Sequence, residues 1–321
     1  MIIDFETTVQ RLRDCDNVQI LTHNNPDGDT LGSGFALLHG LRALGKRVCL
    51  QTETPVPERY AFLVPDDAMA EFTPQTVISV DVADKALLEK GARAALGDRV
   101  DLSIDHHGGN RIFAKETYVD SDAAAVGEIV FLLLTALGVP VTPVIADCLY
   151  TACATDTGCF LYSNTTARTH RIAADLIAAG ADYVRLNTRL FETKSVGFIR
   201  LQQQCLNGME LLAGGALCIL TITRAMLHDT GCSEADLDEL VGLTRQIEGV
   251  RIGVTLKEKP DGGFKISLRT HDDIDAAAVC AKLGGGGHRC AAGCSFNGTR
   301  DALLQKLLPV LRDALKEGAA Q

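Results

Sequence analysis

Short apolar runs alternate along the chain with longer segments in which apolar residues recur every three or four positions. The runs have the length of buried strands, and we predict strands at residues 18–22, 48–50, 77–80 and 100–104. The longer segments have the period of a helix, and we predict helices at residues 4–16, 30–44, 84–96, 122–137, 143–154 and 167–179. Strands that alternate with helices are typical of a doubly wound, mostly parallel sheet, so we expect an α/β fold.

The remainder of the chain predicts a second, smaller α/β unit. Residues 185–208 combine a helical pattern with several polar positions, which is typical of a connecting helix. Beyond them we predict strands at 216–221, 250–256 and 264–269 and a helix at 273–283. We therefore predict a first domain over 1–188, a connecting segment over 189–212 and a second domain over 213–321.

Acidic residues and histidines follow three of the predicted strands and one helix. They are His23, Asp27 and Asp29 after the first strand, Asp81 after the third, Asp105, His106 and His107 after the fourth, and Asp156 in a turn after the helix. Because ligands of open α/β sheets bind at the carboxyl ends of the strands, these side chains are expected to converge. Imidazole nitrogens and carboxylate oxygens suit Mn²⁺, Mg²⁺ or Zn²⁺.

Each of these stretches also has an ordinary structural explanation. The first is a turn rich in Asn, Asp and Gly, Asp81 has the position of a helix N-cap, and His106 and His107 can belong to a surface loop. The occurrence of all four stretches in one chain favours a metal centre.

The net charge restricts the class of substrate. The 321 residues carry a formal net charge of −10, with no Trp and no run of Lys and Arg. Proteins that bind long nucleic acid usually have a basic face. We therefore expect small phosphate-bearing substrates and no long duplex, with bound cations reversing the charge locally.

Cysteine usage and hydropathy predict a cytoplasmic protein. The chain has 11 Cys, an odd number, and no export signal precedes them, which indicates reduced thiols. A cysteine-bound zinc ion is the alternative explanation. No apolar stretch approaches the length of a membrane span, so we expect no membrane association.

The second unit contains a run of four glycines, Gly284, Gly285, Gly286 and Gly287, followed by His288. Such a run can present backbone N–H groups to an anion, although it is often only a flexible loop. Arg269, in the strand that precedes the run, favours a built binding site.

Five motifs, in this order over nearly the whole chain, resemble the DHH phosphoesterase superfamily with its associated C-terminal domain. They are His23-x-x-Pro26-Asp27-x-Asp29, the isolated Asp81, Asp105-His106-His107, Thr155-Asp156-x-Gly158, and the glycine run with His288 and Ala291-Ala292-Gly293. Each motif alone is weak, whereas the five together are specific. The length and the pair of domains are most similar to the bifunctional oligoribonucleases (nanoRNases) that also act as 3′-phosphoadenosine 5′-phosphate (pAp) phosphatases.

The resemblance implies two divalent cations that share the carboxylate of Asp81. Mn²⁺ is the preferred ion, and Mg²⁺ and Co²⁺ are the alternatives. The first cation would be bound by His23, Asp27 and Asp81, and the second by Asp29, Asp81, His106 and Asp156. Asp105 would support His106, and His107 would face the substrate phosphate.

The resemblance also implies the reaction. The cations would activate a water molecule for in-line attack on phosphorus, and the 3′-oxygen would leave. His107 would donate a proton or stabilise the phosphate oxygens. Arg269 and Gly284–His288 would bind the terminal phosphate or nucleotide of the substrate. The active site would lie in a cleft between the two domains, and the limited length of that cleft would favour RNA of about two to five nucleotides. A homodimer is compatible with the sequence.

Several rival functions share part of this pattern. A cyclic-di-AMP or pApA phosphodiesterase is the nearest alternative within the superfamily. Family II inorganic pyrophosphatases carry a basic motif in the second domain that is missing here, and a RecJ-like DNA exonuclease disagrees with the acidic charge. A non-catalytic nucleotide sensor would be free to lose ligands, yet every motif ligand is present.

Overall fold

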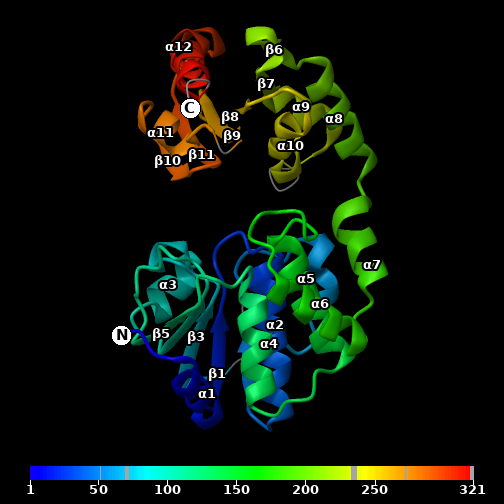
Figure 1. The fold of residues 1–321 in the computed structure, drawn as a ribbon. Helices are drawn as coiled ribbons and strands as arrows, with labels where there is room; N and C mark the ends of the chain where they lie inside the picture. The colour runs from blue at the N-terminus through cyan, green and yellow to red at the C-terminus, as the bar shows by residue number, and fades with distance from the viewer. Residues whose placement is uncertain (51, 69–71, 233–236, 272, 319–321) are drawn as a thin grey trace. The chain divides into compact units, whose positions relative to one another are not determined.

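The computed structural model describes residues 1–318 except 51, 69–71, 233–236 and 272. The chain forms two compact units, Met1–Thr193 and Lys194–Gln321 (Figure 1). The division lies within the predicted connecting segment. The predicted domain boundaries and the predicted location of the active site between the domains stay predictions.

The first unit contains a five-stranded, wholly parallel sheet in the order β2-β1-β3-β4-β5. The strands are β1 (Val18–Leu21), β2 (Val48–Leu50), β3 (Thr76–Val80), β4 (Leu102–Asp105) and β5 (Glu116–Val119). From β1 the chain turns outward to β2 on one side, and β3 then pairs with the other side of β1. This reversal is the topological switch point at which doubly wound sheets bind their ligands. The sheet confirms the predicted fold class and adds β5, which was not predicted.

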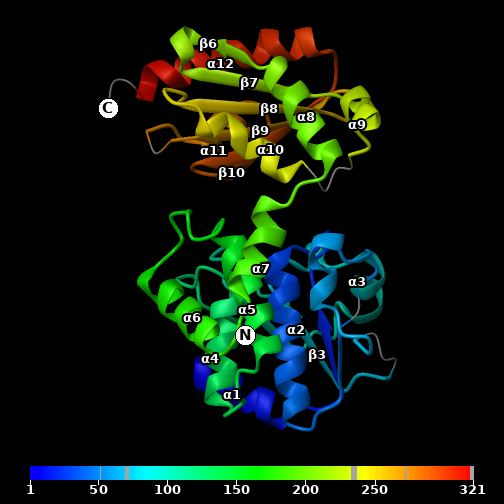
Figure 2. The same ribbon diagram turned by 90° about the vertical axis from the view of Figure 1, so that its right-hand side faces the viewer.

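Helices cover both faces of this sheet (Figure 2). The helices of this unit are α1 (Phe5–Asp14), α2 (Gly28–Ala43), α3 (Lys90–Leu96), α4 (Val126–Ala136), α5 (Pro143–Asp156), α6 (Ala167–Ala178) and α7 (Tyr183–Asn187), and of these α6 and α7 pack on α5. Alternate strand residues enter different cores: Ile20 and Ile78 pack with α2, α4 and α5, whereas Leu21 and Val77 belong to a smaller cluster that includes α3. This period of two explains why the strands are almost continuously apolar.

Two predicted helices are broken in the structure. The segment predicted as one helix at 84–96 is a 3₁₀ turn, η2 (Lys85–Leu87), followed by α3, because Asp84 caps η2 through the backbone N–H of Ala86. The segment 185–208 is divided into α7, a π-helical turn (Thr188–Glu192) and α8 (Val196–Asn207). Ser195 begins α8 by accepting a hydrogen bond from the N–H of Phe198.

The second unit is built on a six-stranded mixed sheet in the order β10-β11-β9-β8-β7-β6. The strands are β6 (Glu210–Leu212), β7 (Leu217–Ile222), β8 (Ile252–Glu258), β9 (Phe264–Thr270), β10 (Gly286–His288) and β11 (Ala291–Phe296). The helices that follow α8 are α9 (Arg224–Thr230), α10 (Asp238–Leu243), α11 (Ala276–Ala281) and α12 (Arg300–Gly318). Leu303, Leu307 and Leu311 of α12 are fully or almost fully buried against this sheet, as the four-residue spacing of an amphipathic helix requires.

None of the helices in the described part of the chain is long and apolar enough to cross a membrane.

Candidate metal centre and active site

The turn after β1 places His23 and Asp27 beside each other. Asp27 is the N-cap of α2, and its Oδ1 accepts hydrogen bonds from the N–H groups of Asp29 and Thr30 at 3.1 Å. His23 Nε2 lies 3.6 Å from Asp27 Oδ1. His23 Nδ1 lies 2.9 Å from the carbonyl oxygen of Asn24, which can only accept a hydrogen bond. When the ring is neutral, as a metal ligand has to be, its proton is therefore on Nδ1, and the lone pair of Nε2 points toward the carboxylates.

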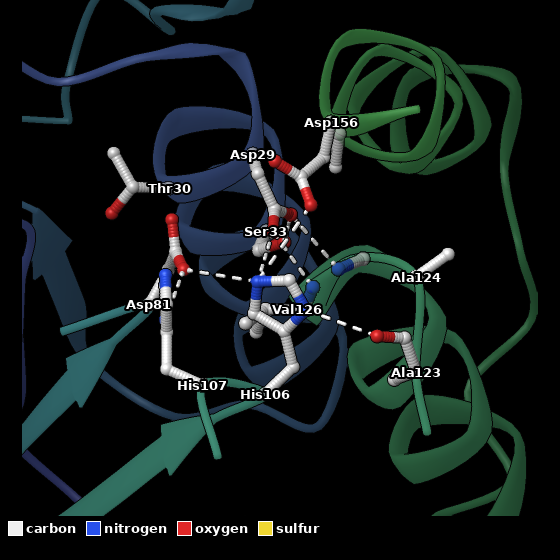
Figure 3. Close-up of polar contacts among 12 residues, drawn as sticks. Asp29, Thr30, Ser33, Asp81, His106, His107, Ala123, Ala124, Val126 and Asp156 are labelled. Carbon is white, nitrogen blue, oxygen red and sulfur yellow. Dashed lines mark hydrogen bonds and ion pairs between the residues drawn. The ribbon is translucent and has the colours of Figure 1, made fainter. Parts of the chain in front are cut away.

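Asp29 is buried under the beginning of α4. Ala125, at the N-cap position of this helix, has no side-chain acceptor. Asp29 supplies the missing acceptor. Its Oδ2 accepts a hydrogen bond from Val126 N–H at 2.7 Å, and its Oδ1 accepts one from Gly127 N–H at 3.0 Å (Figure 3). Oδ1 also accepts a hydrogen bond from the Ser33 hydroxyl at 2.9 Å. Asp29 thus joins α2 to α4 and places a negative charge at a helix N-terminus.

This hydrogen bonding predicts a structural role for Asp29 in addition to any role in metal binding. Asp29→Ala leaves two buried helix N–H groups without an acceptor, and we expect it to lower the free energy of unfolding of the EDTA-treated protein by about 2 kcal/mol. Asp81→Asn is the matched control, because it removes a charge from the same cluster without removing a backbone hydrogen bond. Denaturant titrations that show the two variants to be equally stable would contradict the structural role.

Asp81 lies at the centre of the cluster. It follows β3 with a left-handed backbone, φ 60°, and its side chain is almost fully buried. Oδ2 is 3.7 Å from His23 Nε2, whereas Oδ1 is 3.8 Å from His106 Nε2 and has no hydrogen-bond partner. The helix N-cap explanation for Asp81 is wrong, because Asp84 caps the turn that follows. The two oxygens of Asp81 therefore face two different histidines.

His106 and Asp156 complete the other side of the cluster. His106 Nδ1 is 3.0 Å from the carbonyl oxygen of Ala123, so Nε2 is left to face Asp156, Asp81 and Asp29 at 3.7 to 3.9 Å (Figure 3). Asp156 was predicted in a turn after the helix. In the structure it is instead the last residue of α5.

The first turn of α2 and the last turn of α5 approach each other closely at Gly28. A Cβ at Gly28 would lie 2.4 Å from the hydroxyl oxygen of Thr155, so only glycine fits there. This contact explains how Asp156, which is 127 residues from Asp29, reaches the same cluster.

Asp105 orients His107, not the ring of His106. Its Oδ1 is 2.8 Å from His107 Nδ1, and its Oδ2 accepts from Asn110 Nδ2 at 2.5 Å. Asp105 was predicted to support His106. In the structure it contacts only the backbone of that residue, where its Oδ1 accepts a hydrogen bond from His106 N–H at 2.8 Å. Sequence reasoning missed Asn110 and the carbonyl of Ala123, because an isolated Asn and a backbone oxygen give no distinctive pattern.

The electrostatics of the cluster favour a bound cation. Burial raises the pKa of Asp29 and Asp81 above the usual range and that of Asp156 to about 6. Burial opposes the charge of His23, but the carboxylates of Asp27 and Asp81 outweigh it and raise the pKa of His23 to about 10. The hydrogen bond that His107 Nδ1 donates to Asp105 raises the pKa of His107 to about 9. The raised pKa values mean that burial and crowding disfavour the charged forms of these carboxylates, and a bound divalent cation would offset that charge.

Among the residues that the structure describes, three groups of histidines and aspartates have ligand atoms within 4.8 Å of one another. The groups are His23, Asp27 and Asp81; Asp29, His106 and Asp156; and Asp81, His106 and His107. The structure thus brings together all six residues predicted as metal ligands. Nitrogen and carboxylate donors, with the unpartnered Asp81 Oδ1 between them, fit one or more hard or borderline divalent cations.

The predicted substrate-binding residues lie in the second unit. Arg269 of β9 pairs with Ala291 of β11, and Ala291 pairs with His288 of β10, so the three form one cross-strand row. Arg269 occupies the less buried face of β9, together with the exposed Lys265, and its Nη1 donates to the carbonyl oxygen of Leu268 at 3.0 Å.

The glycine run is not the loop that was predicted. Gly286 begins the edge strand β10, which includes Gly287 and His288. The N–H groups of Gly284 and Gly285 donate to the carbonyl oxygens of Ala281 and Cys280 at the end of α11. These two N–H groups are therefore not available to an anion, because they cap the helix. An edge strand leaves every second N–H of β10 pointing away from its partner.

Known proteins match both units. Residues 17–153 match the DHH family, N-terminal domain, and residues 214–317 match the DHHA1 domain. The chain belongs to the DHH family of phosphoester hydrolases. Within it, the chain is 33% identical to the bifunctional oligoribonuclease and PAP phosphatase NrnA of Thermus thermophilus, over 93% of this chain and 90% of the relative.

Two solved structures show the same fold. An exopolyphosphatase-related protein from Bacteroides fragilis superimposes with a TM-score of 0.85 at 22% identity, over 98% of this chain and 95% of the other. The exonuclease RecJ bound to manganese superimposes with a TM-score of 0.53 at 15% identity, over 99% of this chain and 95% of the other.

Proposed function

We propose that this protein hydrolyses short oligoribonucleotides, of about two to five nucleotides, to mononucleotides and converts pAp to AMP. The observation that carries the proposal is the cluster of three histidines and five aspartates at the switch point of the parallel sheet. The printed activity of the Thermus relative, which aligns over nearly its full length, supports the choice of substrate.

We assign the cluster to two divalent cations, preferably Mn²⁺, which accompanies RecJ in its structure. One cation would take His23, Asp27 and Asp81, and the other Asp29, Asp81, His106 and Asp156. When bound, such a pair supplies Lewis acidity and a reactive water at neutral pH. Asp81 suits the shared position, because its two oxygens face the two histidines that would belong to different cations.

The remaining residues of the cluster bring one side chain, His107, to the substrate. Asp105 holds His107 through Nδ1, and the His107 side chain is nearly half exposed. The other ring nitrogen, Nε2, is then free to donate to a phosphate oxygen or to the leaving 3′-oxygen. Asn110 keeps Asp105 in place through its second oxygen. In this arrangement Asp105 and Asn110 are positioning residues and His107 is the catalytic one.

A substrate panel tests the proposed function. The purified protein is incubated with Mn²⁺ and pAp, RNA of graded length, pApA, a cyclic dinucleotide or pyrophosphate. We expect the highest kcat/KM for pAp and the shortest RNAs, with activity falling as RNA lengthens and disappearing in EDTA. A preference for the cyclic dinucleotide or for pyrophosphate would replace the proposal with one of the rival activities.

We assign a phosphate that is not cleaved to the row of Arg269 and His288 in the second unit. A guanidinium binds phosphate by bidentate, charge-assisted hydrogen bonds. Arg269→Ala should therefore raise the KM for pAp and dinucleotides about 30-fold. Hydrolysis of bis-p-nitrophenyl phosphate, which has no second phosphate, should change little.

Lys265→Ala provides the matched control. Lys265 carries the same charge as Arg269 and lies on the same face of β9, four residues before it. This variant should leave both substrates unaffected. The assignment of Arg269 fails if its variant slows the generic ester as much as pAp, because the residue would then serve the fold or the reaction centre.

A further inference from the structure

The loop between α5 and α6, residues 157–166, carries an exposed apolar surface directly beside the metal centre. It is the green segment that projects from the first unit in Figure 2. Leu161 is 83% exposed and Tyr162 is 50% exposed, so an aliphatic side chain and an aromatic ring lie next to each other at the surface. Residues 157–165 include no charged side chain, so the loop does not repel a phosphate-bearing ligand.

The loop is held in a strained backbone conformation. Gly158, Cys159 and Phe160 are consecutive left-handed residues, with φ of 55°, 58° and 66°. This conformation is rare for cysteine and phenylalanine, and such strain concentrates at functional sites. The Phe160 ring anchors the loop in the first unit, 5.9 Å from the Tyr150 ring and 5.5 Å from the His170 ring.

The same loop is tied to both sides of the metal centre. Asn164 Nδ2 donates to the carbonyl oxygen of Asp156 at 3.1 Å and to that of Ala124 at 3.0 Å. Asp156 belongs to the cluster, and Ala124 follows the residue whose carbonyl oxygen orients His106. The position of the loop is therefore coupled to the position of the ligands.

Tyr162 is placed by a close contact with Gly158. A Cβ at Gly158 would lie 2.3 Å from the Tyr162 ring, so the ring packs on the bare backbone two residues after Asp156. Two residues span at most about 7.6 Å between Cα atoms, which keeps the ring near the cluster. One side of the ring is covered by Gly158, and half of the side chain remains exposed.

We propose that Tyr162, with Leu161 beside it, is the stacking platform for the base of the nucleotide whose phosphate binds at the aspartate and histidine cluster. The inference rests on the proposed function, in which the ribose joins a base to that phosphate. Stacking on an aromatic ring is tolerant of base identity, which suits an enzyme that degrades RNA of any sequence. An apolar residue next to the ring extends the surface that the base covers.

A fluorescence experiment tests binding without turnover. The chain has no Trp, so Tyr162→Trp introduces a single reporter at the proposed platform. With Mg²⁺ bound, AMP should quench this fluorescence saturably, whereas ribose 5-phosphate and inorganic phosphate should not. Tyr183→Trp is the control, because Tyr183 of α7 is 42% exposed in the same unit and should give no response to AMP. Equal responses at the two positions, or equal quenching by ribose 5-phosphate, would overturn the proposal.

Kinetics separate this inference from the proposed function. Tyr162→Ala should raise the KM for pAp roughly 5- to 100-fold, as the loss of one base stack does, with kcat nearly unchanged. Tyr162→Phe should restore the wild-type KM, and ribose 3,5-bisphosphate should not distinguish the variants. If the wild-type protein cleaves pAp and Tyr162→Ala has the same KM, the platform is wrong while the function stands. If the wild-type protein cleaves no nucleotide, the proposed function itself fails.

A second copy of this chain is the competing occupant of the surface. In that case Tyr162→Ala would lower the sedimentation coefficient of the protein, and the Trp signal of Tyr162→Trp would depend on protein concentration without AMP. Either result would overturn the base-stacking role.

Discussion

Asp81→Asn is expected to lower kcat/KM for pAp by at least about 1000-fold, because it removes the one carboxylate that faces both halves of the cluster. Asn keeps the shape of the side chain and is among the few residues that tolerate the left-handed backbone at φ 60°. Metal analysis after gel filtration should show that the variant retains less Mn²⁺ than the wild-type protein.

The same variant should be at least as stable as the wild-type protein in EDTA. Burial raises the pKa of Asp81, so the folded protein disfavours its charged form at neutral pH, and a neutral isostere removes that cost. Asp84→Asn is the matched control: Asp84 lies three residues further, caps η2 outside the three ligand groups, and should affect neither metal content nor rate. Full metal loading of Asp81→Asn would refute the shared-carboxylate assignment.

The second large effect divides the adjacent histidines. His106→Ala should lose metal, because His106 Nε2 faces three carboxylates while the Ala123 carbonyl holds the ring. His107→Ala should keep nearly normal metal affinity and lose about two to four powers of ten in kcat, the range for one proton donor or electrostatic partner. Isothermal titration with Mn²⁺ and steady-state kinetics on pAp measure the two properties separately.

A double-mutant cycle sharpens this division. If Asp105 acts through His107, then Asp105→Asn and His107→Ala should reduce kcat together no further than His107→Ala alone. His107 Nδ1 also lies 3.6 Å from Asp81 Oδ1, within the third group of ligand atoms. Equal loss of metal from the His106 and His107 variants would therefore make His107 a ligand and contradict its catalytic role.

The elements that the sequence predicts well are those whose signal is local. The strands near Ile20 and Ile78 are short apolar runs, and α1 and α6 bury residues at the spacing of an amphipathic helix, so the type of these elements follows from the neighbouring residues. The cluster could be anticipated for a related reason: in a parallel sheet the carboxyl ends of the strands lie at one edge, so polar residues that follow successive strands must meet.

The features that sequence reasoning missed depend on contacts between distant segments. Asp29 accepts hydrogen bonds from Val126, 97 residues away, and no pattern around either residue announces that contact. The edge strand β5 is half polar, so its alternation is too weak to distinguish it from a loop. Gly286 and Gly287 are a strand only because β11 pairs with them.

The sequence by itself determined the fold class and the set of chemical groups at the site, because hydrophobic period and residue type are properties of the chain. Only the tertiary structure decided how those groups are used. It assigned Asp105 to the ring of His107, gave Asp81 two differently directed oxygens, and placed Tyr162 on Gly158. These outcomes depend on which distant backbone atoms come within hydrogen-bonding or packing distance, and that is set only when the helices close on the sheet.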